Sequence, residues 1–234
     1  MKIIIISEKD VPSIFPAQDA ICITVRTIAD LENHRDADLY IDLDFSAAGT
    51  GGIAGTGGIA EKSGIADAGM VDEARIAALS ALLPSPVIVD AVVPTLARIG
   101  QPFIRINGWP GFLERDVHEL AAPDEATATQ ITALYQQTGR SCRIVPDTPG
   151  MISARIIASI INEAWYTWEE GVSSKAEIDT AMKLGTNYPM GPFEWSERIG
   201  PSRICQLLEV LSREDARYRP ANGLQQATAE LKCD

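Results

Sequence analysis

The chain has 234 residues, of which 46% are hydrophobic and 22% are charged, which is ordinary for a globular protein that buries a substantial core. Its formal net charge of −12 argues against a nucleic-acid partner and against contact with anionic membranes, because both require a basic surface. The four cysteines are scattered and form no CxxC pair, so we expect no metal site. No secretion signal or membrane-length apolar run is found, which predicts a cytoplasmic protein.

The first 146 residues alternate short apolar runs with helical or irregular segments. The runs are continuously apolar, and this pattern is typical of strands covered on both faces in a parallel α/β sheet. Two of the intervening segments have helical spacing of their apolar residues. We expect strands at 3–6, 20–25, 39–43, 86–93, 103–106 and 142–145, and helices at 73–83 and 124–139.

The character of the chain changes after Pro149-Gly150. Apolar residues recur at 3.6-residue spacing from Ile152 to Trp168, which predicts a long, heavily buried helix that ends near Gly171. This pattern divides the chain into an α/β domain over 1–146 and an all-α domain over 147–234.

More helices are expected in the second domain. Ser174 and Glu177 have the spacing of a capping box, so a helix should begin there and stop at Gly185. Pro192 is suited to open another helix, which would close near Gly200. The remaining helices are expected at 202–212 and 221–231.

A glycine-rich stretch between Ser46 and Gly69 repeats the hexapeptide Gly-Thr-Gly-Gly-Ile-Ala at 49–54 and 55–60. Its letters fit a phosphate-binding loop, which makes Gly49, Gly51 and Gly52 weak candidates for cofactor binding. Such a loop must open a helix, however, and glycine at this density disfavours one. A loop without a nucleotide site is the simpler interpretation.

Two motifs carry a resemblance to a known family. The first is Asp147-Thr148-Pro149-Gly150-Met151-Ile152, and the second is Tyr188-Pro189-Met190-Gly191-Pro192-Phe193-Glu194. With Asn162-Glu163-Ala164 between them, the segment from about 103 to 201 resembles the 3-hydroxyacyl-CoA dehydrogenases of fatty acid metabolism. The resemblance implies a Rossmann-like NAD domain followed by a helical domain that dimerises and helps to close over an acyl-CoA. NAD is the family cofactor.

The resemblance also tells where the catalytic groups should lie. Family members use a histidine four residues before a proline as the base, a glutamate twelve residues after it, and an asparagine beside the helix arginine. Aligned on Pro110, the histidine position falls on Ile106 and the glutamate position on His118. The asparagine position falls on Ala154, next to Arg155. Neither Ile106 nor Ala154 can serve the expected chemistry, so it is uncertain from the sequence whether the chain is an enzyme.

Only weak catalytic candidates take the place of these residues. Asn107 follows the lost base and is able to bind a carbonyl group, but it is no base near neutral pH. His118 is the other candidate, and the alternative is a surface or capping histidine in a polar stretch. Its neighbour Glu119 should point in a different direction, so the two are not expected to form a pair.

The N-terminal domain departs further from the family pattern. The glycine fingerprint should follow the first strand, yet Ile6 leads into Ser7-Glu8-Lys9-Asp10. No glycine allows a pyrophosphate to approach, and the acidic side chains would repel it. We therefore expect no NAD binding in the usual mode, and the sequence predicts no cofactor with confidence.

Three hypotheses follow. The leading one is a divergent relative without the usual hydride transfer, which keeps a homodimer surface and a groove for an acyl-CoA-type small molecule. The alternatives are an active enzyme with relocated groups or completed by a partner chain, and a dimeric scaffold without enzymatic activity. The predicted groove residues are Asn187, Tyr188, Pro189, Met190 and Pro192. A basic patch of Arg213, Arg217 and Arg219 is interpreted either as a CoA phosphate contact or as a solvated helix end, the second being favoured.

Overall fold

The computed structural model describes residues 1–11, 14–15, 20–45 and 72–230. The chain forms two compact units, Met1–Thr148 and Pro149–Asp234. The glycine-rich repeat with Gly49, Gly51 and Gly52 lies outside the described residues, so the structure does not bear on that candidate site.

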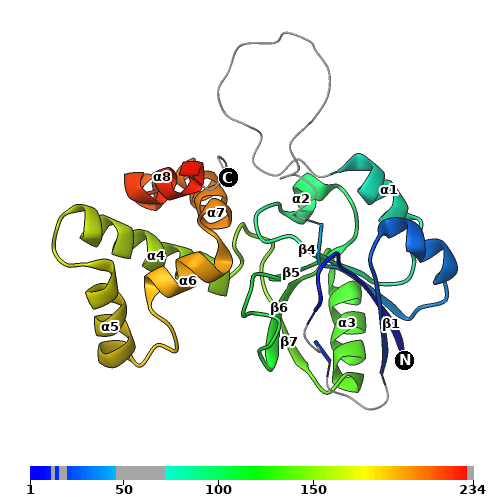
Figure 1. Cartoon of the computed structure of the whole chain (residues 1–234). Helices are drawn as coiled ribbons and strands as arrows, with labels where there is room; N and C mark the ends of the chain where they lie inside the picture. Colours follow the sequence, from blue (N-terminus) through cyan, green and yellow to red (C-terminus); the bar gives the residue numbers. More distant parts are fainter. Residues whose placement is uncertain (12–13, 16–19, 46–71, 231–234) are drawn as a thin grey trace, which may run out of the picture. The chain divides into compact units, whose positions relative to one another are not determined.

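The first unit is built around a seven-stranded sheet in the order β2-β1-β3-β4-β5-β6-β7 (Figure 1). All neighbouring strands are parallel except β5 and β6, which are antiparallel. A strand overlaps each of the predicted apolar runs, which are 3–6, 20–25, 39–43, 86–93, 103–106 and 142–145. The strands are β1 Lys2–Ile6, β2 Ile21–Val25, β3 Leu39–Asp42, β4 Val87–Asp90, β5 Ile104–Ile106, β6 Val117–Ala121 and β7 Ser141–Ile144.

Both faces of this sheet are covered, which explains why its central strands are apolar without alternation. Ile3 and Ile5 face a cluster that includes Ile131 and Tyr135 of helix α3, Glu125–Gln137. Ile4 and Ile6 face the other side, where they pack with Leu79 of helix α1, Glu73–Ser80. The 3₁₀ helix η1, Ile28–Asn33, and the short helix α2, Leu96–Ile99, add buried side chains to the α1 side.

Strand β6 was not predicted, and it corrects the expectation of a purely parallel sheet. Its sequence Val-His-Glu-Leu-Ala contains two polar residues and therefore lacks the continuous apolarity of the other strands. It pairs antiparallel with β5 on one side and parallel with β7 on the other. His118 thus lies on an inner strand of the sheet, next to the edge strand β7.

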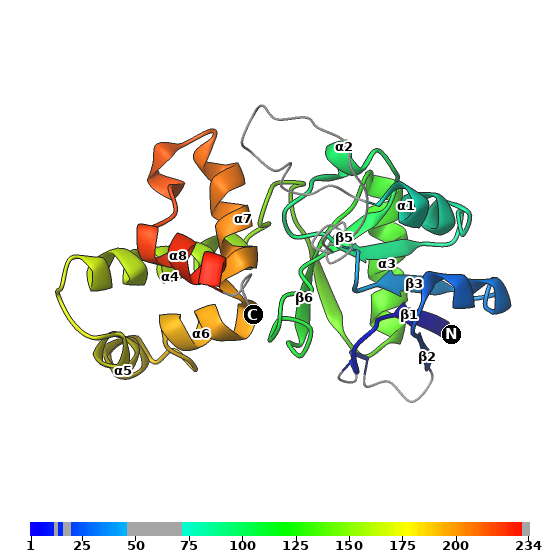
Figure 2. The ribbon, with the colours of Figure 1, turned by 45° about the horizontal axis from the view of Figure 1, so that its top comes forward.

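The second unit is helical (Figure 2). Its central helix α4 contacts α5, α6, α7 and α8. The buried face of α4 is formed mainly by Ala154, Ala158, Ile161, Ala164 and Trp165, and small residues there let the neighbouring helices approach closely. The elements are α4 Ser153–Glu169, α5 Lys175–Thr186, α6 Pro192–Ile199, α7 Pro201–Ser212, η2 Ala216–Tyr218 and α8 Asn222–Glu230.

The helix-end signals explain these bounds. Ser174 and Glu177 form the predicted capping box, because Ser174 Oγ accepts the N–H of Glu177 at 3.3 Å and Glu177 Oε2 accepts the N–H of Ser174 at 3.1 Å. Helix α5 does not stop at Gly185, which corrects the prediction. It continues to Thr186, and Asn187 ends it in the left-handed conformation with φ of 57°. The predicted fold class, an α/β Rossmann-like domain followed by a helical one, is confirmed.

Candidate functional site

The carboxyl edge of the parallel strands is the first place to look for a site. Strand β1 pairs with β2 on one side and β3 on the other, so the connection from β1 to β2 and the connection from β3 to β4 leave in opposite directions. Ligands of open α/β sheets bind in the crevice that such a reversal creates. Ser7 and Glu8 follow β1 here, Asp42 is the last residue of β3, and Asp44 follows β3.

The backbone amides after β1 are already hydrogen-bonded within the chain. Ser7 N–H donates to the carbonyl oxygen of Val25 at 3.0 Å. Glu8 N–H donates to Asp44 Oδ2 at 2.7 Å, and Lys9 N–H donates to Ser7 Oγ at 3.3 Å. These are the amides that a Rossmann loop would aim at a pyrophosphate.

Carboxylates dominate the same edge. Asp42 is completely buried and receives Arg75 through two bonds, Nε–Oδ2 at 2.6 Å and Nη2–Oδ1 at 2.5 Å. Burial raises the pKa of Asp42, and the Arg75 guanidinium opposes this rise. Nearby, Arg26 is engaged by Asp10 at 2.5 Å. The Asp44 carboxylate already occupies the position on Glu8 N–H where a phosphate oxygen would bind. This edge therefore does not fit the pyrophosphate of NAD.

The ends of β4 and β5 form a second part of the edge, around the position of the missing base. The Asp90 carboxylate accepts the N–H of Gly108 at 2.9 Å. Asn107 Oδ1 accepts the N–H of Trp109 at 3.1 Å, which closes a local turn. Both polar side chains are buried. A Cβ on Gly108 would lie 2.5 Å from Asp90 Cγ, so only glycine lets the carboxylate approach the backbone there.

The residues at the expected catalytic positions are buried as well as apolar. Ile106 is 1% exposed and belongs to the core cluster on the α3 side of the sheet. Ala154 is fully buried on α4. Neither residue has a group that accepts a proton or polarises a carbonyl.

His118 lies inside the first unit and is 2% exposed, so it is neither a surface nor a capping histidine. Its Nε2 lies 3.0 Å from the carbonyl oxygen of Leu113, and its Nδ1 lies 3.3 Å from the hydroxyl of Tyr135. A carbonyl only accepts, so Nε2 carries the proton and Nδ1 accepts from Tyr135. Burial lowers the pKa of His118, which keeps the ring neutral. Both ring nitrogens are therefore engaged within the protein.

A buried arginine was missed by sequence reasoning. Arg105 of β5 is fully buried, with Nε donating to Ala91 O at 2.8 Å and Nη2 donating to Val92 O at 3.0 Å. Its Nη1 forms an ion pair with Asp147, whose carboxylate also accepts the N–H of Leu96 at 2.9 Å. The sequence signal that could have predicted this ion pair was an arginine within an apolar run, together with Asp147 of the first motif. This network fixes the segment after β4.

The predicted groove residues lie in the turn between α5 and α6, except Pro192, which is the first residue of α6. Asp179 of α5 caps α6, since its carboxylate accepts the N–H groups of Phe193 at 2.8 Å and Glu194 at 3.2 Å. A Cβ on Gly191 would lie 2.3 Å from Asp179 Cγ. The glycine is thus required by the turn itself, and a groove at this turn stays a prediction. Gly191 and Pro192 are buried, Tyr188 and Met190 are half-buried, and Asn187 and Pro189 are exposed.

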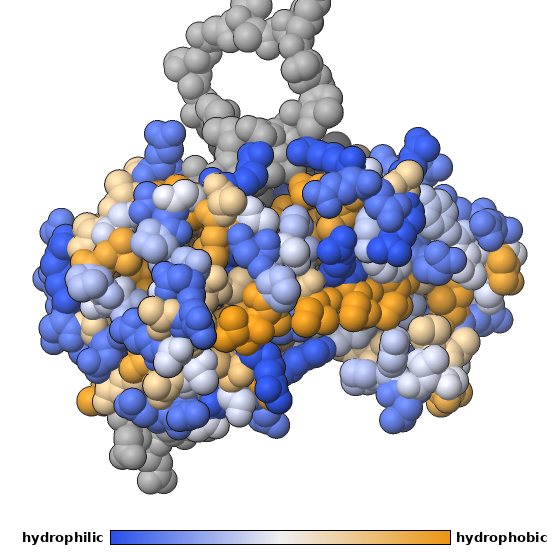
Figure 3. Space-filling model, turned by 180° about the vertical axis from the view of Figure 1, so that it is seen from behind, coloured by the Kyte–Doolittle hydropathy of each residue, from blue (hydrophilic) through white to orange (hydrophobic). Residues whose placement is uncertain are grey.

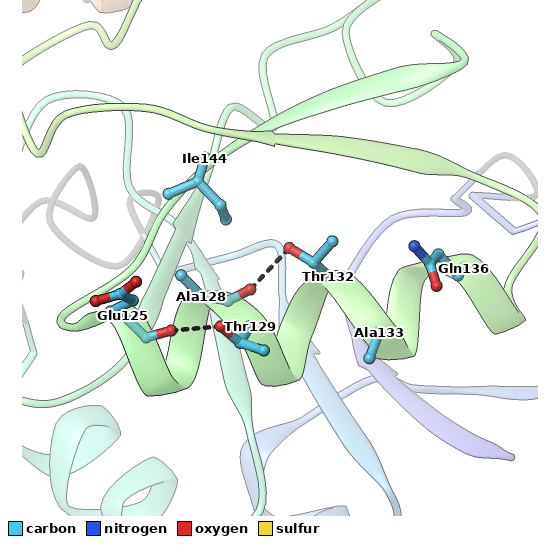
Figure 4. Close-up of a pocket in the computed structure, with 7 residues that line it drawn as sticks. All are labelled: Glu125, Ala128, Thr129, Thr132, Ala133, Gln136 and Ile144. Atoms are coloured by element: carbon cyan, nitrogen blue, oxygen red, sulfur yellow. Dashed lines mark hydrogen bonds between the residues drawn. The ribbon is translucent and has the colours of Figure 1, made fainter.

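A shallow surface pocket of about 420 Å³ lies between α3 and β7 (Figure 4). The hydroxyls of Thr129 and Thr132 do not point into it as donors for a ligand. They donate instead to the carbonyl oxygens of Glu125 and Ala128 in their own helix, at 2.9 and 2.7 Å. None of the predicted site residues lines the pocket. Its lining is Glu125, Ala128, Thr129, Thr132, Ala133, Gln136 and Ile144.

A membrane span or a metal centre would be a further kind of functional feature in the described part of the chain. None of the helices there has the length and apolarity that a membrane span requires. In the same part of the chain, no three His, Cys, Asp or Glu side chains gather as ligands of a metal ion.

Comparison with known proteins identifies the relatives. Residues 150–232 match the family described as 3-hydroxyacyl-CoA dehydrogenase, C-terminal domain. The helical unit belongs to the 3-hydroxyacyl-CoA dehydrogenase family. This confirms the resemblance that the motifs between Asp147 and Glu194 carry.

The similar proteins bear names of the same family. The 3-hydroxyadipyl-CoA dehydrogenase of Escherichia coli is 40% identical over 131 residues, which is 55% of this chain and 27% of that protein. The 3-hydroxybutyryl-CoA dehydrogenase of Bradyrhizobium diazoefficiens is 39% identical over 101 residues, which is 42% of this chain and 34% of that protein. The chain thus spans about a third of the length of the curated relatives that it matches.

A solved structure extends the likeness in fold to most of the chain. The (S)-3-hydroxybutyryl-CoA dehydrogenase of Ralstonia eutropha superposes with a TM-score of 0.63 over 89% of this chain and 70% of that one. At 24% identity this likeness concerns the fold alone. It supports the Rossmann-like architecture of the first unit.

Proposed function

We propose that this chain is a divergent relative of the 3-hydroxyacyl-CoA dehydrogenases that binds an acyl-CoA-type ester and does not itself perform NAD-dependent hydride transfer. The observation that carries the proposal is the state of the amides after β1. The N–H groups of Ser7, Glu8 and Lys9 have partners within the chain, and the partner of Glu8 is the Asp44 carboxylate. A carboxylate in this place excludes a second anion by charge repulsion.

The base position supports the same proposal. A hydride donor must lose its hydroxyl proton, and a family histidine would take it. Ile106 stands there, and the neutral His118 has both nitrogens bound to Leu113 and Tyr135. Relocated chemistry would have to use another group.

A second candidate function rests on Asp90. Its buried carboxylate adjoins Gly108, and so it lies beside Asn107 at the end of β5. A carboxylate there would serve as a relocated base, with Asn107 to bind the carbonyl oxygen of a substrate. In that case the chain would be an active dehydrogenase, provided that the dinucleotide comes to it in another mode or on a partner chain.

One preparation tests both candidates. Acetoacetyl-CoA and NADH are assayed for turnover, and thermal unfolding is followed with each ligand alone. We expect the ester to raise the melting temperature, NADH to leave it unchanged, and turnover to be absent, because a ligand stabilises the state that binds it. Turnover that is lost in Asp90→Asn would establish the second candidate instead. Stabilisation by neither ligand would favour the scaffold without enzymatic activity.

The helical unit is also proposed to form a homodimer. Helix α4 exposes Ile152 and Ile156 at 50% and 56%, on a side different from its buried alanines. Figure 3 shows that hydrophobic side chains also reach the surface of the protein. A helix that is apolar on two sides is typical of one covered on both. A second copy of α4 is the cover that we propose.

A further inference from the structure

Two arginine side chains of the helical unit converge on one tyrosine. Arg155 lies in the first turn of α4, and Arg217 lies in η2. Both donate to the hydroxyl oxygen of Tyr218, Arg155 through Nε at 3.2 Å and Arg217 through Nη2 at 2.6 Å. Their guanidinium carbons lie 5.0 and 4.6 Å from the centre of the Tyr218 ring. The ring, 8% exposed, thus serves as a fixed platform for two positive charges.

The two arginines keep positive charge and N–H donors that have no partner in the described part of the chain. In the described part of the chain, Arg155 has no carboxylate partner, and its terminal N–H groups bind no acceptor. Arg217 pairs with Asp215 at 3.0 Å, but the two side chains are 68% and 50% exposed, and pairs in such exposed positions contribute little. A guanidinium has five N–H donors, so Arg217 also keeps donors free of Asp215 and Tyr218.

The segment that carries Arg217 and Tyr218 is held in place from α4. The buried Asn162 donates to the carbonyl oxygen of Arg219 at 2.9 Å and accepts the N–H of Ala221 at 2.8 Å. The hydroxyl of Tyr166 donates to the same Arg219 carbonyl at 3.0 Å. The two guanidinium groups are therefore positioned before any ligand arrives, which lowers the entropic cost of binding.

We propose that Arg155 and Arg217 form an anion site for a phosphate group of the CoA part of the ester. Two guanidinium groups held on one ring repel each other, and an anionic ligand between them would relieve this repulsion. Arginine suits phosphate because its planar fork binds two oxygens at once. This inference rests on the proposed binding of an acyl-CoA ester and assigns the place where the ester's nucleotide part is held.

Calorimetric titration of the full chain with acetoacetyl-CoA tests the assignment. We expect Arg155→Gln and Arg217→Gln each to weaken binding about tenfold or more, the usual loss for a charged hydrogen bond. The matched control is Arg143→Gln, which removes one exposed positive charge from β7 of the other unit and should leave the affinity unchanged. The same ester without its 3′-phosphate identifies the phosphate. If the 3′-phosphate is the one bound, this ester should bind the wild type as weakly as the variants.

Asp215→Asn gives a change of opposite sign. Asparagine keeps the oxygen that accepts the N–H of Arg217, so η2 retains its cap, but the competing charge disappears. We expect binding to tighten by about two- to fivefold, the scale of an exposed ion pair. A purely structural role of the two arginines predicts no tightening.

The possible failures are distinguishable. If the ester binds the wild type and both arginine variants with one affinity, the site assignment is overturned while the proposed function stands. If the ester does not bind the wild type, both are overturned. Thermal unfolding of each variant confirms that a lost affinity does not come from a lost fold.

Discussion

The state of His118 shows how a single residue limits the chemistry of this chain. The sequence placed a histidine where the family has a glutamate, and the nearby polar letters suggested exposure. The structure buries it against Leu113 and Tyr135 with both nitrogens occupied. Sequence could not predict this contact, because it depends on β6. The polar residues of β6 break the continuous apolar pattern that marks the other strands. Ile106 and Ala154, by contrast, were readable from the motif spacing alone.

The buried histidine predicts a pH dependence of stability. Its pKa is lowered in the folded state, so the unfolded chain takes up the proton first as the pH falls below about 6.5. The unfolded state then binds more protons, and the free energy of unfolding decreases toward acid by up to about 1.4 kcal/mol per pH unit. Urea unfolding between about pH 7 and pH 5 should show this decrease in the wild type and a smaller one in His118→Gln. Equal slopes for the two proteins would contradict the assignment.

Asn162 is predicted to be the most sensitive polar residue of the helical unit. Truncation to alanine removes both of its hydrogen bonds and leaves the Arg219 carbonyl and the Ala221 amide with fewer partners. We expect Asn162→Ala to destabilise the protein by about 2–4 kcal/mol in denaturant unfolding. Tyr166→Phe removes a single, solvent-exposed hydrogen bond to the Arg219 carbonyl and should lower the free energy of unfolding by only about 0.5–1.5 kcal/mol. A loss for Asn162→Ala no larger than that for Tyr166→Phe would argue against this clamp.

At the scale of elements, local signals predicted the helical unit better than the sheet. Ser174 with Glu177 marked the start of α5, and Pro192 marked the start of α6, because capping and proline chemistry act within one turn. The end of α5 was predicted at Gly185, but glycine is only one way to stop a helix, and Asn187 takes the left-handed position instead. The formation of strand β6 depends on pairing with its neighbours β5 and β7, so no local sequence pattern predicts it.

The turn between α5 and α6 gives a test at this scale. Gly191→Ala places a Cβ against Asp179, and we expect a loss of about 1–3 kcal/mol in the free energy of unfolding. In an Asp179→Ala background the added cost of the alanine should largely vanish, which a double-mutant cycle measures. Gly185→Ala is the matched control, since it lies within α5 with nothing within 4 Å, and it should stabilise by about 0.5–1 kcal/mol. Additive effects at positions 179 and 191 would refute the close approach.

At the scale of the whole molecule, the residues that indicate the family lie in the helical unit, whereas the residues that bear on NAD binding lie in the first unit. The motifs in the helical unit made the family predictable, because turns and helix ends keep their residues wherever the backbone needs them. The first unit has the strand order of a Rossmann-like sheet, and Asp42, Asp44 and Arg75 lie at its carboxyl edge. Sequence indicated the missing glycines there, but only the structure shows that the amides after β1 already have partners.

The proposed homodimer follows from the two apolar sides of α4. A charge on the exposed apolar side of α4, at Ile156, should abolish association, because it would be buried without a partner in the dimer and solvated in the monomer. We expect light scattering to give twice the chain mass of 25.2 kDa for the wild type and the single mass for Ile156→Glu. Leu184→Glu places the same charge at another exposed apolar residue, on α5, and should leave the dimer intact. A dimer that survives Ile156→Glu but dissociates with Leu184→Glu would move the interface from α4 to α5.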